Sequence, residues 1–353
     1  MTELAPLITM LPQELDWHRA RITFLAQFLV AVIRVRTVNL TEIATAFCGR
    51  SKTESSYRRI QRFFQAFEIA PSLIPTLVVR LLPLDATWTL CLDRTNWQLG
   101  AINLNFLVLA VAHHGIAIPL FWSLLDKRGH SNTKERIRLM RRFLRQFGAQ
   151  RIHCLTADRE FIGVLWLRFL RKHQIPFRLR IRHNTQLPLR CGAGHENASR
   201  FFRNAPLGVV RLLRSPRPLW GLPVYVVGLR LAQEYLILIT DARPDPALDD
   251  YRRRWDIETL FGCLKTHGFH LEDTHLTAHQ RLSKLLALLT ITCCWCVRLG
   301  AWRHAQRAIP LKSHQRRAVS LFRYGLDVLR NIVLNLAVKP HEFAWVVKLL
   351  SCT

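Results

Sequence analysis

The chain has 353 residues, half of them hydrophobic, so it is long enough for two or three domains around a sizeable core. Its 51 lysines and arginines against 24 acidic residues give a net charge of +27. Stability does not require such an imbalance, and self-repulsion opposes it, so a polyanionic partner is the simplest explanation. The basic residues occur in every segment, which excludes a single basic tail and favours a long nucleic-acid surface.

The nine cysteines are an odd number and follow no regular framework. The chain starts without a charged-then-apolar signal segment, so we expect reduced thiols and a cytoplasmic location. Cys293, Cys294 and Cys296 form CCWC, but no second Cys/His pair stands at zinc-finger spacing, and buried thiols are favoured over a metal site. Cys191 and His195 are likewise only half of a metal site.

Residues 1–82 are expected to form a helical DNA-binding domain. Two short helical segments, VNLTEIATAF and SKTESSYRRIQRFFQAF, flank a break at Gly49. The second segment is basic and offers Arg58, Arg59 and Arg62 to DNA, as in a helix-turn-helix protein. The alternative is a plain helical subdomain with a solvated basic face.

Residues 83–183 are expected to form the first part of an α/β core. Apolar runs of strand length alternate with amphipathic stretches in the order strand, strand, strand, helix, strand, helix, strand. These elements are predicted over residues 87–93, 102–112, 116–125, 131–147, 151–157, 161–173 and 177–182.

Residues 184–243 are interrupted by prolines and glycines, so no long helix fits there. We expect a β-rich insertion with short strands at 207–213, 224–231 and 235–240. A helix that completes the core follows within residues 244–275. Residues 276–353 are expected to form a C-terminal helical region, in which the apolar stretch 285–297 is too short for a membrane span and reads as a buried helix.

The helix expected at residues 245–268 carries the most informative pattern. Tyr251, Arg254, Glu258 and Lys265 fall within about 60° of one another on a helical wheel. Asp245 is expected to cap this helix, with Pro246 in its first turn and Gly268 at its stop. One face thus presents a carboxylate between a phenol and two cations. For an ordinary helix, this pattern indicates salt bridges on an exposed face.

Two further carboxylates stand at the ends of predicted strands, Asp93 in LCLDRTNW and Asp158 in LTADREF. Taken singly, each could be a turn former or a helix cap. In an α/β sheet, however, ligands gather beyond the carboxyl ends of the strands. If the two strands are adjacent, Glu258 can complete an oxygen-only pocket that suits Mg²⁺.

Other acidic residues are weaker candidates. Tyr251, Arg254, Glu258 and Lys265 form one stripe along the helix. Asp256 and Asp249 lie on the far side of the helical wheel from this stripe, so they are expected to point away. Asp126 ranks below Asp93 because the far end of its strand leads into the basic helix. Glu160 is expected to support Asp158 or to open the next helix.

At these residues the sequence resembles DDE transposases of bacterial insertion sequences, specifically the insertion-sequence-four group. That group has the signature Y-x2-R-x3-E-x6-K, which Tyr251, Arg254, Glu258 and Lys265 match at every interval. LCLDRTNW resembles its first-aspartate strand and LTADREF its second-aspartate motif. The resemblance covers about residues 85–275.

The resemblance implies an RNase H-like core in which Asp93, Asp158 and Glu258 hold two Mg²⁺ ions, with Mn²⁺ as a substitute. It also implies that Tyr251 and the two cations of the signature hold the DNA near the scissile phosphate. The implied partners are double-stranded DNA, as element ends and target, and a second copy of the chain in a synaptic dimer at the nucleoid; no membrane partner is expected.

The implied activity is cleavage at terminal inverted repeats followed by joining of the 3′ ends to target DNA. One alternative is an RNase H-like nuclease or resolvase without strand transfer. The other is a DNA-binding regulator without catalysis.

Overall fold

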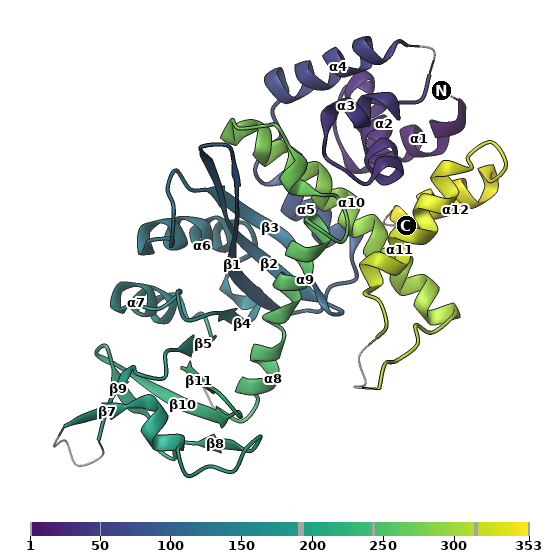
Figure 1. Cartoon of the computed structure of the whole chain (residues 1–353). Coiled ribbons are helices and arrows are strands. Elements are labelled where there is room, and N and C mark those ends of the chain that lie inside the picture. Colours follow the sequence, from purple (N-terminus) through teal and green to yellow (C-terminus); the bar gives the residue numbers. More distant parts are fainter. Residues whose placement is uncertain (1, 50, 190–193, 242–243, 314–316, 352–353) are drawn as a thin grey trace.

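The computed structural model describes residues 2–49, 51–189, 194–241, 244–313 and 317–351, built around one large mixed β-sheet (Figure 1). The strand order is β3-β2-β1-β4-β5-β11-β10-β8, with β9 paired to β10, while β6 and β7 pair separately. β1, β4 and β5 are mutually parallel, and the other pairs are antiparallel. The strands are Trp88–Leu99 (β1), Ile102–His113 (β2), Ile116–Leu124 (β3), Ile152–Ala157 (β4), Phe177–Ile181 (β5), Gln186–Pro188 (β6), His195–Asn197 (β7), Val210–Leu212 (β8), Arg217–Leu219 (β9), Leu222–Arg230 (β10) and Tyr235–Thr240 (β11).

Helices cover both faces of this sheet and build a helical region beside it, which packs on β3 through α5 and α10 (Figure 1). The α-helices are Ala5–Glu14 (α1), Arg19–Val35 (α2), Leu40–Thr45 (α3), Thr53–Ala66 (α4), Leu73–Leu81 (α5), Thr133–Phe147 (α6), Val164–Lys172 (α7), Ala247–Arg252 (α8), Trp255–Leu264 (α9), His279–Gln306 (α10), Leu321–Leu334 (α11) and Pro340–Leu350 (α12). α6 and α7 lie on one side of the sheet, and α8 and α9 on the other (Figure 1). The first helices pack against the last ones, α1 against α12 and α2 against α11.

The predicted order of strands and helices in the first part of the core is confirmed. The predicted end of the first strand at Asp93 is wrong, because β1 continues to Leu99 and pairs with β2 over its whole extra length. Gly100 has a positive φ of 56°, which lets the chain reverse directly after the strand. Asp93 therefore lies inside β1, at the level where its neighbour β4 ends.

The strands of the predicted β-rich segment extend the core sheet. β11 pairs antiparallel with β5, with Leu238 opposite Arg180, and β10 pairs with β11. The predicted strand at 207–213 shrinks to the short edge strand β8. This edge is broken by turns, and its residues are exposed on both sides, so little burial supports a longer strand.

The single helix predicted over residues 245–268 is instead two helices, α8 and α9. Arg253 and Arg254 join them with right-handed helical backbone angles, so the second helix continues close to the first. Asp245 does not cap the helix, because α8 begins only after Pro246 and has no side-chain cap. The predicted stripe therefore spans a joint between two short helices.

The predicted glycine stop lies just beyond α9. The helix ends at Leu264, and the chain then folds back so that Phe269 N donates to Cys263 O. A side chain at Gly268 would meet that carbonyl oxygen at 2.0 Å. Only glycine allows this close approach of backbone to backbone.

α10 is the central helix of the molecule, packed against α11, α5, α12 and α2 as well as β3. It contains the CCWC stretch, whose three thiols are buried as predicted. By length and composition it is the one helix among the described residues that could cross a membrane, but 83% of its apolar window is buried inside the protein. Its apolar surface is thus accounted for as core.

α10 and α11 meet in direct backbone contact at Gly300 and Gly325. A Cβ at Gly300 would lie 1.9 Å from Leu321 O, and one at Gly325 would lie 1.8 Å from Cys296 O. We expect Gly300→Ala to lower the free energy of unfolding by about 1–3 kcal/mol, because the two helices must separate to admit the methyl group. Thermal and denaturant unfolding measure the change.

Gly262→Ala in α9 is the matched control. Its Cβ would meet only the His267 side chain, at 3.1 Å or more, and a side chain can move. We expect its stability to be unchanged or raised by up to about 1 kcal/mol through helix propensity. An equal loss in both variants would contradict the close-contact explanation.

Candidate active site

Asp93 and Asp158 come from adjacent strands, as predicted. β1 and β4 run parallel with Leu92 opposite Ala157. Asp93 follows Leu92 and Asp158 follows Ala157, so the two aspartates lie at the same level of the two strands. Burial raises the pKa of Asp93 to about 6, and the nearby carboxylates of Glu160 and Asp158 contribute to the rise. Two partly buried carboxylates thus lie side by side on two adjacent inner strands, at the level where β4 ends. This arrangement favours a bound cation.

Arg254 joins this pair of strands to α9. Its guanidinium donates to Glu258 Oε1 at 2.6 Å and to Asp93 Oδ2 at 3.5 Å. The structure therefore brings the helix carboxylate to the strand carboxylate through a shared cation. The salt-bridge interpretation of the stripe is correct for this pair, and it involves a side chain that is nearly buried.

Three polar atoms at this site have no hydrogen-bond partner among the described residues. They are the buried Asp158 Oδ1, Arg254 Nε and the Tyr251 hydroxyl oxygen. A buried polar atom without a partner is costly and calls for an explanation. The carboxylate oxygen is an acceptor that a metal ion would satisfy, while the guanidinium and the phenol are donors that an anionic oxygen would satisfy.

The Tyr251 ring is buried in a small hydrophobic cluster. It packs with Val227, Leu238, Ala247 and Leu248 between α8 and the sheet. Burial raises the pKa of its hydroxyl, which therefore stays a neutral donor. The Arg254 guanidinium lies 5.6 Å from the ring centre.

Lys265 reaches the far part of the β1 hairpin. Its ammonium group donates to Asn96 O at 3.0 Å, pairs with Glu272 at 2.8 Å and lies 5.7 Å from the Trp97 ring centre. The ammonium group of Lys265 therefore contacts β1 three residues beyond Asp93.

The competing acidic residues point elsewhere. Asp256 lies against the Gly115 backbone in the β2–β3 turn, and burial raises its pKa to about 6. Asp126 is 88% exposed and pairs with His279. The exclusion of Asp256 from the stripe and the rank of Asp126 below Asp93 are consistent with these positions.

A supporting network behind Asp93 could not be predicted from the sequence. Arg94 donates to both oxygens of Glu160, at 2.7 and 2.9 Å, and to Asn105 Oδ1 at 3.1 Å. His130 also contacts Glu160, at 2.8 Å. The only sequence signal was the acidic residue two positions after Asp158, and its partners lie far away in the chain.

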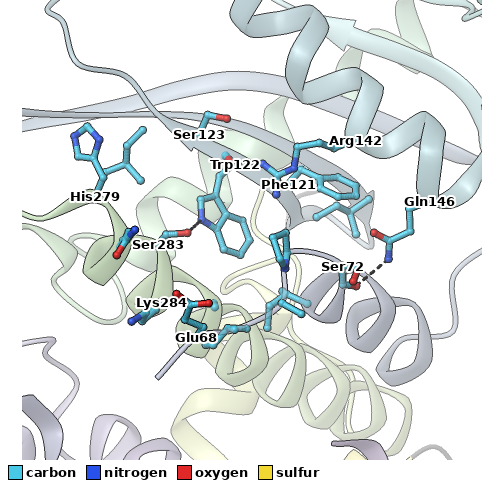
Figure 2. Close-up of a pocket in the computed structure, with 18 of the residues that line it drawn as sticks. Glu68, Ser72, Phe121, Trp122, Ser123, Arg142, Gln146, His279, Ser283 and Lys284 are labelled. Carbon is cyan, nitrogen blue, oxygen red and sulfur yellow. Dashed lines mark hydrogen bonds between the residues drawn. The ribbon is translucent and has the colours of Figure 1, made fainter. Parts of the chain in front are cut away.

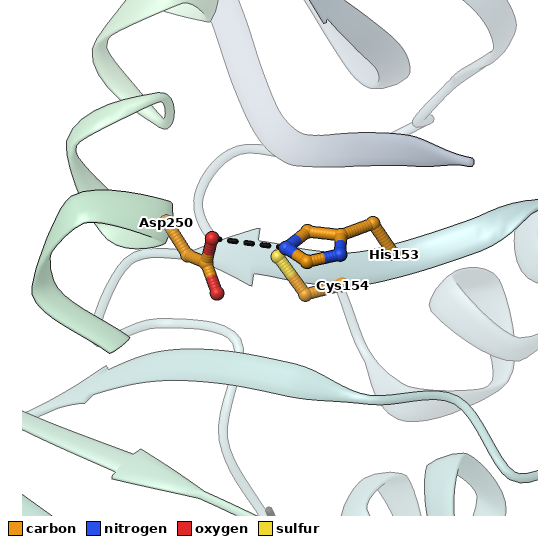
Figure 3. Close-up of side chains that lie close together, drawn as sticks. All are labelled: His153, Cys154 and Asp250. Atoms are coloured by element: carbon orange, nitrogen blue, oxygen red, sulfur yellow. Dashed lines mark hydrogen bonds and ion pairs between the residues drawn. The ribbon is translucent and has the colours of Figure 1, made fainter. Parts of the chain in front are cut away.

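The donor set at the site fits a hard divalent cation. Asp93, Asp158 and Glu258 offer only oxygen atoms, and one buried oxygen lacks a partner. The three carboxylates do not form a tight cluster, because Arg254 lies between two of them. Among the described residues, three potential ligand atoms within 4.8 Å of one another occur only at His153, Cys154 and Asp250 (Figure 3).

The predicted DNA-reading arginines lie on α4. Arg58 and Arg62 are exposed, whereas Arg59 is half-buried and donates to Gln27 Oε1 at 3.0 Å. Asn39 caps α3, because its side chain accepts a hydrogen bond from Thr41 N, whereas α4 has Lys52 at its N-cap position and no side-chain cap bond.

A cavity of about 950 Å³ lies apart from these carboxylates, between α5, β3, α6 and α10 (Figure 2). Trp122 forms part of its wall and donates to Ser283 Oγ at 2.7 Å. Arg142 and Lys284 line it as well. None of the residues of the predicted stripe or of the two aspartates contributes to it.

The fold and the site define an α/β protein with carboxylates and cations gathered at one sheet edge. The family model described as "Transposase DDE domain" matches residues 111–296, which is more than half of the chain. The chain therefore belongs to this family of DNA transposases. The matched segment includes Asp158 and Glu258 and begins after Asp93, so the place of Asp93 in the site is supported by its position beside Asp158.

Among solved structures, the chain is similar to the cryo-EM structure of the piggyBac transposase synaptic complex with hairpin DNA. It is 10% identical, with a TM-score of 0.48, and the alignment covers 97% of this chain and 79% of that one. No curated protein matches the chain.

Proposed function

We propose that this transposase serves a bacterial insertion sequence and is similar to the insertion-sequence-four group. It binds the terminal inverted repeats, cleaves at the element ends and joins the 3′ ends to target DNA. The observation that carries the proposal is the unpaired, buried Asp158 oxygen beside Asp93, whose pKa is raised to about 6 by burial. Together with Glu258 these residues form an acidic site bordered by cations, on an RNase H-like core.

Asp93, Asp158 and Glu258 would hold two Mg²⁺ ions, which Mn²⁺ can replace. When bound, such ions activate a water or a 3′-hydroxyl and stabilise the leaving oxygen of a phosphodiester. The Arg94–Glu160 pair keeps the strand edge next to Asp93 in place. It positions the carboxylate without touching the substrate.

The donors of the stripe are assigned to the DNA strand. Arg254 Nε and the Tyr251 hydroxyl have no hydrogen-bond partner within the described part of the chain, so phosphate oxygens can accept from both. Lys265 extends the cationic side of the site along β1. Arg254 and Lys265 neutralise phosphate charge without supplying a ligand for the metals, and the neutral Tyr251 hydroxyl only donates a hydrogen bond.

Double-stranded DNA is the partner that the net charge of +27 favours. The exposed Arg58 and Arg62 of α4 are assigned to the recognition of the element ends. Cleavage at two ends favours a homodimer in the synaptic complex, working in the cytoplasm at the nucleoid.

The test uses duplexes that carry the ends of the element with flanking DNA and a separate target plasmid. With Mg²⁺ or Mn²⁺ we expect cut ends and joined products, separated on denaturing gels, and neither product with a chelator. Cut ends without joined product would support the nuclease alternative. Salt-sensitive binding without any metal-dependent product would support the regulator and overturn the proposal.

A further inference from the structure

A second group of side chains, away from the three carboxylates, has the composition of a metal site. His153, Cys154 and Asp250 present one nitrogen, one sulfur and one oxygen, all within 4.8 Å of one another (Figure 3). His153 and Cys154 belong to β4, and Asp250 belongs to α8, which packs on that strand.

An irregularity in β4 brings the two strand residues to the same side. In the β1–β4 pairing, Trp88 is opposite Ile152 but Thr89 is opposite Cys154, so His153 is an extra residue in the ladder. Successive residues of a regular strand point to opposite faces. A bulge changes the direction of a side chain, and here it lets His153 and its neighbour both approach Asp250.

The separation of the ligand atoms is close to what a metal needs. His153 Nε2 lies 3.0 Å from Asp250 Oδ1. In a tetrahedral site with bonds of about 2.0 Å to nitrogen and oxygen and about 2.3 Å to sulfur, ligand atoms lie roughly 3.3–3.5 Å apart. A small adjustment of side chains therefore suffices to bind an ion.

The outer contacts orient the carboxylate for this role. Arg178 Nε donates to Asp250 Oδ2 at 3.1 Å, which leaves Oδ1 for the metal side. Arg178 is itself buried and donates to Thr240 Oγ1 at 2.7 Å and to Phe177 O at 3.0 Å. Fixed hydrogen bonds to a ligand of this kind are usual around protein metal sites.

We propose that His153, Cys154 and Asp250 bind a borderline-soft divalent cation such as Zn²⁺, with water as the fourth ligand. A nitrogen, sulfur and oxygen set suits zinc and disfavours Mg²⁺. The His153 side chain is 47% exposed, which gives the ion and its water access from solvent. On binding, the Cys154 thiol releases its proton to solvent and coordinates as the thiolate.

The consequence concerns the neighbouring candidate active site. Asp250 directly precedes Tyr251, and α8 continues through Arg253 into the helix of Glu258. A metal that ties α8 to β4 would fix the start of this helix pair against the strand that ends before Asp158. The ion has a structural role and takes no part in phosphodiester chemistry.

The experiment is a Co²⁺ titration of the metal-free, full-length protein under a non-thiol reductant. We expect visible absorption bands of tetrahedral Co²⁺ and a near-ultraviolet thiolate-to-cobalt band, both reversed by Zn²⁺. Cys154→Ser should remove the thiolate band and weaken binding by roughly 100-fold or more, since even changes outside the ligand set cost about 10–100-fold. Cys48 is a half-buried thiol between α3 and α4, far along the chain from β4 and α8, so Cys48→Ser should keep the band.

His153→Gln provides a second variant at a side chain that is 47% exposed, and its affinity for Co²⁺ should fall as well. Asp93→Asn combined with Glu258→Gln should leave the thiolate band intact, which separates this site from the proposed catalytic metals. Absence of the band in the unmodified protein, or its persistence in Cys154→Ser, overturns the proposal. A His153→Gln variant with unchanged Co²⁺ affinity does so too.

Discussion

Asp158→Asn is expected to reduce cleavage of element-end DNA by about 1,000-fold or more while the protein stays folded. Asp158 Oδ1, which has no hydrogen-bond partner among the residues that the structure describes, is the oxygen best placed to take a metal ion. Metal stabilisation of developing charge is worth several kcal/mol. Asp93→Asn and Glu258→Gln should act in the same way. Single-turnover cleavage with Mg²⁺ and with Mn²⁺ measures the loss.

Asp126→Asn is the matched control, because Asp126 is exposed and pairs with His279 away from the strand edge. Its cleavage rate should stay within about twofold of the original, in line with the small effects of exposed substitutions. Retained cleavage in a variant of one of the three carboxylates would remove that residue from the site.

A stability readout separates lost chemistry from lost structure in Asp93→Asn. Burial raises the pKa of Asp93 to about 6, so the folded state holds this proton more tightly than the unfolded state does. The charged form is thus a cost above pH 6, and the cost vanishes as the pH falls towards 4. In buffer with a metal chelator at pH 8, the unfolding free energy of Asp93→Asn should be higher than that of the unsubstituted protein by on the order of 2 kcal/mol. Near pH 4 this difference should disappear.

Periodicity in the sequence predicted part of the contacts at the candidate site. Arg254 and Glu258, four residues apart, form an ion pair even though the helix is broken at residues 253–254, and Arg254 also reaches Asp93. Tyr251 packs against β10 and β11, and Lys265 donates to Asn96 O. The adjacency of the first and fourth strands was a condition of the prediction, because two strands and a helix separate them in the chain. The structure meets this condition, since β1 and β4 pair in parallel and bring Asp93 next to Asp158.

Contacts between residues far apart in the sequence could not be predicted. Nothing local shows that Arg94 pairs with Glu160, 66 positions later, or that Arg254 reaches Asp93 across 161 positions. The bulge at His153 was also hidden, because it depends on how β4 aligns with β1. The end of the first strand was misplaced because polar residues after Asp93 look like a turn, whereas pairing with β2 keeps them extended.

Arg254→Ala is expected to have two separable effects. In the metal-free protein, Asp93 and Glu258 lose the cation that they share, so the unfolding free energy should fall. Removing one partner of a fully buried ion pair costs about 3–5 kcal/mol. Glu258 is 37% exposed, so we expect a smaller loss, about 2 kcal/mol. Added Mn²⁺ should restore more stability to this variant than to the original, since the ion replaces the missing charge.

The second effect is on DNA processing. A DNA strand near the site would lose a guanidinium that can hold two acceptors in fixed directions. We therefore expect cleavage to fall by about 100-fold even when Mn²⁺ has restored stability, a loss of about 2.7 kcal/mol in the barrier. Arg254→Lys keeps the charge but cannot span both carboxylates at once, so it should recover stability better than cleavage.

Arg252→Ala controls for the loss of one arginine in the same segment, because Arg252 is exposed and pairs with the exposed Asp249. Both stability and cleavage should change little there. Full cleavage by Arg254→Ala in Mn²⁺ would mean that the guanidinium only neutralises the carboxylates before metal binds, and the DNA contact would be refuted. Cleavage that stays low while Mn²⁺ restores stability requires a role in the DNA-bound state, which the unpaired Nε of Arg254 leads us to expect.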